Sequence, residues 1–208
     1  MQRYAHVKDD IITGWGLTAQ QIKNRGVRLD MLMPMQDAPL PAHNAVSEYV
    51  IEVAPALNDA GEPVQQWQVL ERGIEDIRAT LTDRLANLRW QRETGGISLP
   101  DGTPVRTDRN TQTQLTGAVV QAQAGVLTEV RWKLENGFVT LTAAQLLGIA
   151  TAVAAHVARC FAAEEVVTTA ITAAETTEAL KDINLVEAFE AALTEIQNSS
   201  AEKEASNA

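Results

Sequence analysis

The hydrophobic and polar positions of this chain follow a strand-like pattern at first and a helical pattern later. Four short runs, rich in alternating, β-branched or aromatic residues, predict strands at 4–7, 11–15, 46–53 and 66–70. Between the first two runs, Lys8-Asp9-Asp10 predicts a tight turn. The N-terminal part is therefore expected to be a small β-rich module.

Two connections in this module have their own signals. Asn58-Asp-Ala-Gly61 predicts a turn between the last two strands. Residues 31–41 contain three prolines, which predict an extended loop. Three methionines in this loop suit either local packing, which we favour, or contact with a partner.

Helical spacing begins after Gly73. Residues 73–93 are predicted to form an amphipathic helix that ends at Gly95-Gly96, since glycine readily adopts the left-handed backbone beyond a helix end. Its apolar stripe consists of Ile74, Ile77, Leu81, Leu85 and Leu88. Docking of this stripe on its own domain is favoured over pairing between subunits.

Two hairpins are expected to flank the next helix. Pro100-Asp101-Gly102 predicts a tight turn in the first hairpin, and Asn136-Gly137 predicts the second, between residues 126–133 and 138–141. Thr107-Asp108 is a helix-start signal for residues 109–124.

The remaining sequence is free of proline and is predicted to be helical. Thr142 and Gln145 form a capping-box signal, and a break is expected near Thr176-Thr177. Short helices at 178–182 and 185–196 are expected to follow. The stripe predicted for the long helix comprises Leu146, Ile149, Val153, Val157 and Phe161, followed by Val167, Ile171 and Ala174.

These elements predict an α+β fold with a small N-terminal β-rich module, a central amphipathic helix, two β-hairpins and a helical C-terminal region. The expected segments are a β-rich module at 1–70, a connecting helix at 71–94, an α+β domain at 95–197 and a flexible polar tail at 198–208.

The net charge of the chain excludes some classes of binding partner from what we expect. The net charge is −10, and most of it lies after Cys160, where ten acidic residues accompany only Lys181 and Lys203. Nucleic acid and anionic membranes attract Lys and Arg, so neither is an expected partner. The apolar stretch at 141–161 contains polar and charged residues and is expected to be a buried helix, without membrane insertion.

Histidine and cysteine are the first candidates for chemistry. His6 and His43 have no companion at ligand spacing, whereas His156 lies four residues before Cys160 on the predicted helix. A thiol among Val and Ala side chains would have a raised pKa and poor access, so we interpret His156 as structural. A single cysteine and the absence of a signal-peptide pattern predict a reducing cytoplasm.

Acidic and aromatic residues give two further alternatives. Asp9, Asp10, Asp101 and Asp108 would form a metal or acid–base set, but Asp101 is better explained as a turn residue and Asp108 as a helix cap. The four tryptophans are interpreted as core anchors, with sugar stacking as the alternative; they are Trp15, Trp67, Trp90 and Trp132. No zinc spacing, phosphate loop or nucleophile elbow is present, so we expect no catalytic residue, metal or cofactor.

A set of distinctive residues occurs in a fixed order between Trp90 and Asp182. It comprises Trp90, Arg92, Gly95-Gly96-Ile97, Asp101-Gly102, Thr107-Asp108, Gln114-Leu115, Trp132-Lys133, Asn136-Gly137-Phe138-Val139, Leu141, Ile149, Val153, His156-Val157 and Phe161 to Glu164. This order resembles a domain of unknown function that is common in tailed bacteriophages and prophages. Such domains usually belong to tail proteins encoded near the tail fibres, often labelled tail or tail-fibre assembly proteins.

The resemblance implies a setting and no chemistry, because the family has no established catalytic residues. It implies synthesis in a host bacterial cytoplasm, a place in the virion tail if the protein is structural, and binding to tail-fibre or baseplate proteins. A homo-oligomer, with a trimer favoured, is expected. The alternatives are an assembly chaperone absent from the mature virion and a polysaccharide-binding or polysaccharide-cleaving tail protein. The motif positions are interpreted as structural.

Overall fold

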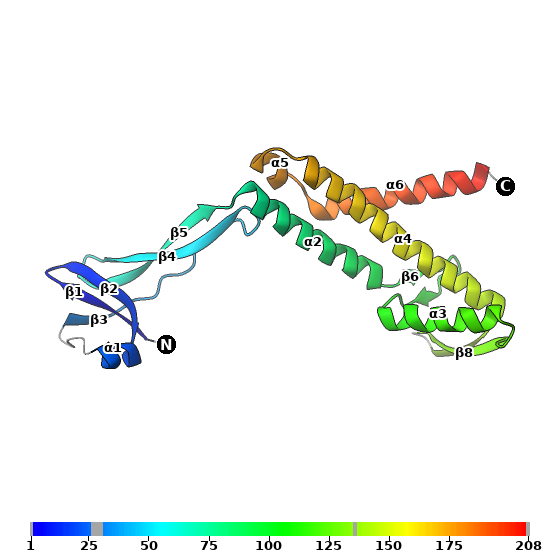
Figure 1. The fold of residues 1–208 in the computed structure, drawn as a ribbon, viewed down its shortest axis with the longest axis horizontal. Coiled ribbons are helices and arrows are strands. Elements are labelled where there is room, and N and C mark those ends of the chain that lie inside the picture. Colours follow the sequence, from blue (N-terminus) through cyan, green and yellow to red (C-terminus); the bar gives the residue numbers. More distant parts are fainter. Residues whose placement is uncertain (1, 26–30, 135–136, 207–208) are drawn as a thin grey trace. The chain divides into compact units, whose positions relative to one another are not determined.

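The computed structural model describes residues 2–25, 31–134 and 137–206, and the chain divides into two compact units, Met1–Gly73 and Ile74–Ala208. The predicted α+β class is confirmed, because strands dominate the first unit and helices the second (Figure 1).

The first unit contains two small antiparallel sheets, one with strand order β2-β1-β3 and the other formed by β4 and β5. Its elements are β1 (Arg3–Lys8), β2 (Ile11–Thr18), α1 (Ala19–Arg25), β3 (Leu32–Pro34), β4 (Glu48–Leu57) and β5 (Pro63–Glu71). Asp9 and Asp10 have φ angles of 50° and 59° in the predicted β1–β2 turn, a conformation that aspartate tolerates in two-residue hairpins.

Two features of this unit were not predicted. Thr18 and Gln21 exchange hydrogen bonds that begin the short helix α1. The predicted loop at 31–41 instead begins with β3, which pairs with β1, and the Met35 N–H donates to the Arg3 carbonyl at 2.9 Å. Met35 is buried, so packing is confirmed for this methionine.

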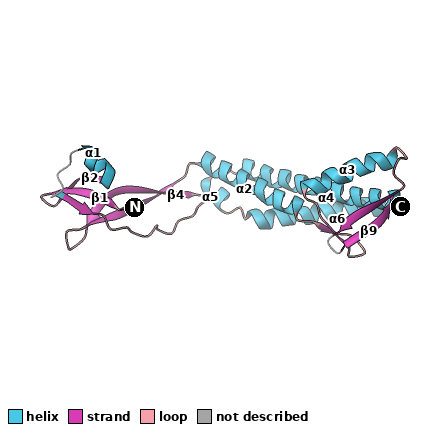
Figure 2. Cartoon of the chain, turned by 90° about the horizontal axis from the view of Figure 1, so that it is seen from below, coloured by secondary structure: helices cyan, strands magenta, loops and turns pink. Residues whose placement is uncertain are grey.

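The second unit is built on long helices, which Figure 2 shows side by side. Its elements are α2 (Ile74–Thr94), β6 (Ile97–Ser98), β7 (Pro104–Val105), α3 (Arg109–Gln123), β8 (Glu129–Leu134), β9 (Gly137–Thr142), α4 (Ala143–Ala173), α5 (Thr177–Lys181) and α6 (Leu185–Ser206). Helices α2, α3 and α6 all pack against α4. Near its C-terminal end α4 also receives a hydrogen bond from α2, because Arg78 Nη2 donates to the Ala174 carbonyl at 2.9 Å.

Local start and stop signals were predicted well in this unit. The Asp108 side chain accepts the Thr111 N–H at 3.0 Å at the start of α3. Thr142 and Gln145 form the predicted capping box of α4. A core cluster joins α3, α4 and both hairpins; it contains Val105, Leu115, Leu141, Leu146, Ile149 and Val153.

The apolar stripe predicted for α4 is confirmed at both ends of the helix but is wrong near its middle. The predicted Leu146, Ile149, Val153, Val167 and Ile171 are buried. Cys160 and Ala163 are buried, whereas Phe161 is exposed. The buried positions continue with steps of three and four residues to Val167. This spacing follows the helical period more closely than the predicted run of four-residue steps, which drifts around the helix.

Helix α6 also differs from the prediction. The helix was expected to end at 196 and a flexible tail to follow at 198–208, but α6 continues to Ser206. Residues 197–206 contain neither proline nor glycine and include two alanines, two glutamates and a lysine, all of which favour a helix.

Helix α4 is long and apolar enough to cross a membrane, by length and composition alone. The helix packs against α2, α3 and α6, and 28% of its most apolar window is buried.

Candidate functional site

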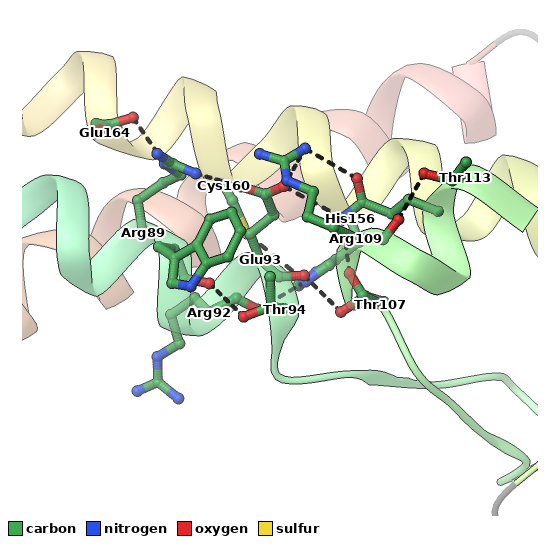
Figure 3. Close-up of polar contacts among 12 residues, drawn as sticks. Arg89, Arg92, Glu93, Thr94, Thr107, Arg109, Thr113, His156, Cys160 and Glu164 are labelled. Carbon is green, nitrogen blue, oxygen red and sulfur yellow. Dashed lines mark hydrogen bonds and ion pairs between the residues drawn. The ribbon is translucent and has the colours of Figure 1, made fainter. Parts of the chain in front are cut away.

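The most unusual side chain of the second unit is the carboxylate of Glu93, which is 0% exposed near the end of α2. Its Oε2 pairs with Arg89 Nη1. Its Oε1 lies 3.2 Å from Arg109 Nη1 and accepts a hydrogen bond from Gln112 Nε2 at 3.3 Å. Figure 3 shows Arg89 and Arg109 converging on Glu93 where α2, α3 and α4 meet. Both oxygens are therefore paired, as a buried charge requires.

The backbone around Glu93 is also tied to the start of α3. The buried Thr107 hydroxyl donates to the Glu93 carbonyl at 2.5 Å and accepts the Gly96 N–H at 2.9 Å. Gly96 has a φ of +92°, and a Cβ there would lie 3.2 Å from the Val105 carbonyl oxygen. This position thus needs glycine for both its conformation and its space.

Arginines extend the cluster to neighbouring helices. Arg89 Nε donates to Glu164 on α4 at 3.1 Å, and its guanidinium lies 4.5 Å from the centre of the Phe161 ring. Arg92 Nη2 lies 2.5 Å from Glu190 on α6. Such contacts fix how the helices pack, because each links side chains from two helices.

His156 and Cys160, whose helical spacing allows a contact, lie close together but are not arranged as a nucleophile and base. His156 Nε2 lies 3.0 Å from the Arg92 carbonyl, to which it donates, and 3.8 Å from Cys160 Sγ. A nitrogen that carries this proton cannot accept one from the thiol. Burial, and secondarily the charge of Glu93, raises the pKa of the Cys160 thiol. The pair therefore fits a structural role.

The Glu93 cluster gathers only some of the motif positions. Trp90, Gly96 and His156 lie in or beside it, with the Arg109 guanidinium 5.0 Å from the centre of the Trp90 ring. Gly95 lies next to this cluster at the end of α2, where a Cβ would come within 2.9 Å of the Gln91 carbonyl oxygen.

The remaining motif positions lie away from the Glu93 cluster, in turns and at a helix cap. Asp101 accepts the Thr103 N–H at 2.9 Å in the β6–β7 turn, and the same turn places Gly102 at a φ of +82°. Gly137 begins β9 with a φ of +131°, whereas Asn136 lies outside the described residues. Backbone hydrogen bonds lower the pKa of Asp101 and, at its helix cap, of Asp108.

The interpretation of all four tryptophans as core anchors is wrong for two of them. Trp132 packs against the core cluster and Trp67 donates from Nε1 to the Ala38 carbonyl at 3.0 Å, both partly buried. Trp15 and Trp90 are exposed. The Arg109 guanidinium lies over one face of the Trp90 ring. The exposed ring is therefore stabilised by a cation–π contact and not by burial in the core.

Sequence reasoning missed Glu93 and Arg89, and it identified Thr107 only as part of a helix-start signal. A signal was available, because Glu93 lies eight residues after Leu85 and thus continues the buried stripe of α2 with a charge. The partners Arg109 and Gln112 could not be predicted from the helical period of α2, because they lie on another helix, α3.

The chemistry that this arrangement supports is limited. The oxygens of Glu93 are occupied and closed to solvent, so they are not placed to exchange protons with a substrate. Within the described ranges, no three His, Cys, Asp or Glu side chains gather as a metal site would require. A separate groove of about 700 Å³ lies between the β6–β7 turn, β9 and α4, and no tryptophan lines it.

The family assignment rests on residues 76–185, which match the model of a "Domain of unknown function (DUF4376)". Neither a curated protein nor a solved structure matches the chain. The match begins in α2, contains the whole Glu93 cluster apart from Glu190, ends at the first residue of α6 and covers just over half of the sequence. The chain therefore belongs to the DUF4376 family.

Proposed function

We propose that this chain is a non-enzymatic bacteriophage tail protein that binds tail-fibre or baseplate components, as a structural virion subunit or fibre-associated protein. The proposal takes its setting from the resemblance of residues 90–182 to phage and prophage tail domains. A scaffold that presents surfaces to partners needs well-fixed helices and no reactive pocket.

The observation that supports this role best is that the polar side chains of the Glu93 cluster bond to one another and to the backbone around them. Glu93, Thr107 and His156 all make contacts that hold α2, α3 and α4 together. An active site usually leaves at least one such group free to meet a substrate. This cluster instead favours a rigid framework whose outer faces do the binding.

Mass spectrometry of purified phage particles from the strain that carries the gene tests the proposal. A structural subunit is expected in intact particles at a fixed ratio to the fibre protein. The chaperone alternative predicts the opposite distribution: absence from particles, co-purification with newly made fibre, and aggregation of fibre made without it. Absence from both particles and fibre complexes would refute the tail role.

The second alternative, a polysaccharide-cleaving tail protein, has its own test. The purified chain is expected to give no clearing on gels containing host cell-wall or capsular polysaccharide. Clearing that disappears in Asp108→Ala, with folding retained, would replace the non-enzymatic proposal.

A further inference from the structure

The outer face of the β8–β9 hairpin is unusual for an exposed surface. Phe138 is 64% exposed, and the cations of Arg131 and Lys133 lie 5.9 Å and 5.8 Å from the centre of its ring. Strand alternation places Trp132 and Val139 on the opposite face, against the core. The hairpin thus presents one aromatic ring between two positive charges, and among the described residues neither cation forms an ion pair.

The same chain carries a surface of opposite charge. The outer side of α6 holds Glu195 and Glu202, seven residues apart and hence on one stripe. They border a shallow hollow of about 690 Å³, lined by α6 residues alone, which includes the small side chains of Ala191 and Thr194. Both glutamates are exposed, and among the described residues neither makes a side-chain hydrogen bond or ion pair.

Positive and negative charges also lie in different segments of the second unit. From Arg84 to Lys133 basic residues outnumber acidic ones, whereas acidic residues dominate after Cys160. Within one chain, no hydrogen bond or ion pair between described residues joins the hairpin face to α6. Opposite charges on two separate surfaces of one chain favour contact between copies.

We propose that the Arg131/Lys133/Phe138 face of one copy docks on the Glu195/Glu202 stripe of a second copy. The arginine and lysine pair with the two glutamates, and the phenylalanine ring packs in the hollow that these glutamates border. The contact is head-to-tail, so repetition closes a ring when the rotation allows it. The inference is separate from the tail role, since a chain that self-associates in this way yet is absent from tails would retain it.

Charge reversal in the full-length chain tests this contact, with sedimentation velocity as the measurement. The wild-type chain is expected to self-associate, and increasing salt is expected to weaken the association. The pair Arg131→Glu with Lys133→Glu, and separately the pair Glu195→Lys with Glu202→Lys, should each weaken self-association by at least about tenfold. Phe138→Ala should weaken it as well.

The decisive step is to mix the two reversed chains, because the acidic hairpin of one then meets the basic helix of the other. The mixture is expected to form hetero-oligomers. Arg84→Glu and Glu165→Lys are matched controls that reverse exposed charges elsewhere and should leave association unchanged; circular dichroism verifies folding of every variant. A wild-type chain that is monomeric up to about 100 µM, reversals without effect, or a mixture that stays monomeric would each overturn the proposal.

Discussion

Glu93 brings a charge into the interior of the second unit, where it is held by Arg89, Arg109 and Gln112. We expect Glu93→Ala to lower the free energy of unfolding by about 3–5 kcal/mol, because Arg89 would lose its buried counter-charge and keep only Glu164, and Gln112 would lose an acceptor. Glu93→Gln is the matched control: it keeps the shape and one acceptor and should cost less, about 1–3 kcal/mol.

Urea denaturation followed by circular dichroism measures both variants of Glu93. If Glu93→Ala unfolded like the wild type while binding to tail components was lost, the carboxylate would have a functional role and the framework interpretation of the cluster would fail.

Asp108 offers a residue-scale prediction that depends on pH. Its carboxylate caps α3, and hydrogen bonds from Thr111 hold its pKa below the ordinary value. Asp108→Ala should therefore destabilise the chain by about 1 kcal/mol near neutral pH. A carboxyl whose pKa is lowered by folding stabilises the fold above its unfolded pKa, and this contribution disappears as pH falls through the folded pKa.

The stability difference between Asp108→Ala and the wild type should accordingly shrink as the pH is lowered in a series of urea titrations. Asp108→Asn serves as the control, since asparagine caps helices well without a charge. A difference that stays constant through the acidic range would show that the cap does not act through its ionised form.

At the scale of elements, the sequence predicted the features whose partners lie a few residues apart. It did not predict the features that depend on contacts between distant segments. The turns at Asp9-Asp10 and Asp101-Gly102 and the capping box at Thr142 were predicted because their partners lie within a few residues. The stripe of α4 slipped by one position near Cys160, because which alanine or aromatic residue is buried depends on where α2 and α6 pack.

The same difference between local signals and distant contacts explains which residues of the candidate site could be predicted. The sequence identified the motif glycines, Asp108 and His156 as structural residues, but it did not identify Glu93, beside which Gly96 and His156 lie. Helix α1 was missed because a seven-residue helix without an apolar stripe of its own gives little periodic signal.

The β8–β9 hairpin allows a comparison between its two faces. Trp132 packs on the core cluster, whereas Phe138 lies exposed on the other side. Trp132→Ala should lower the free energy of unfolding by about 3 kcal/mol, near the lower limit for large aromatic residues because its ring is only partly buried. Phe138→Ala should leave stability within about 0.5 kcal/mol of the wild type. Equal effects of the two substitutions, measured by urea denaturation, would contradict this assignment of faces.

At the scale of the whole molecule, the two units differ in how much hydrophobic core they contain. Among the described residues, the first unit buries Ala5, Ile22 and Met35 together with Pro55 and Pro63, whereas the second unit buries many more apolar side chains, from Ile77 on α2 to Ala192 on α6. Burial of apolar surface is the main favourable contribution to folding, so the two units are expected to differ in stability.

A fragment of residues 74–208 should therefore fold on its own and unfold cooperatively at nearly the same urea concentration as the α-helical signal of the full chain. A fragment of residues 1–73 should unfold at a lower concentration, because small sheets with few buried side chains are only marginally stable. Circular dichroism of both fragments beside the full chain measures this difference. A helical fragment that stays unfolded, while the β-rich fragment folds, would mean that the core of the second unit requires the first unit for its stability.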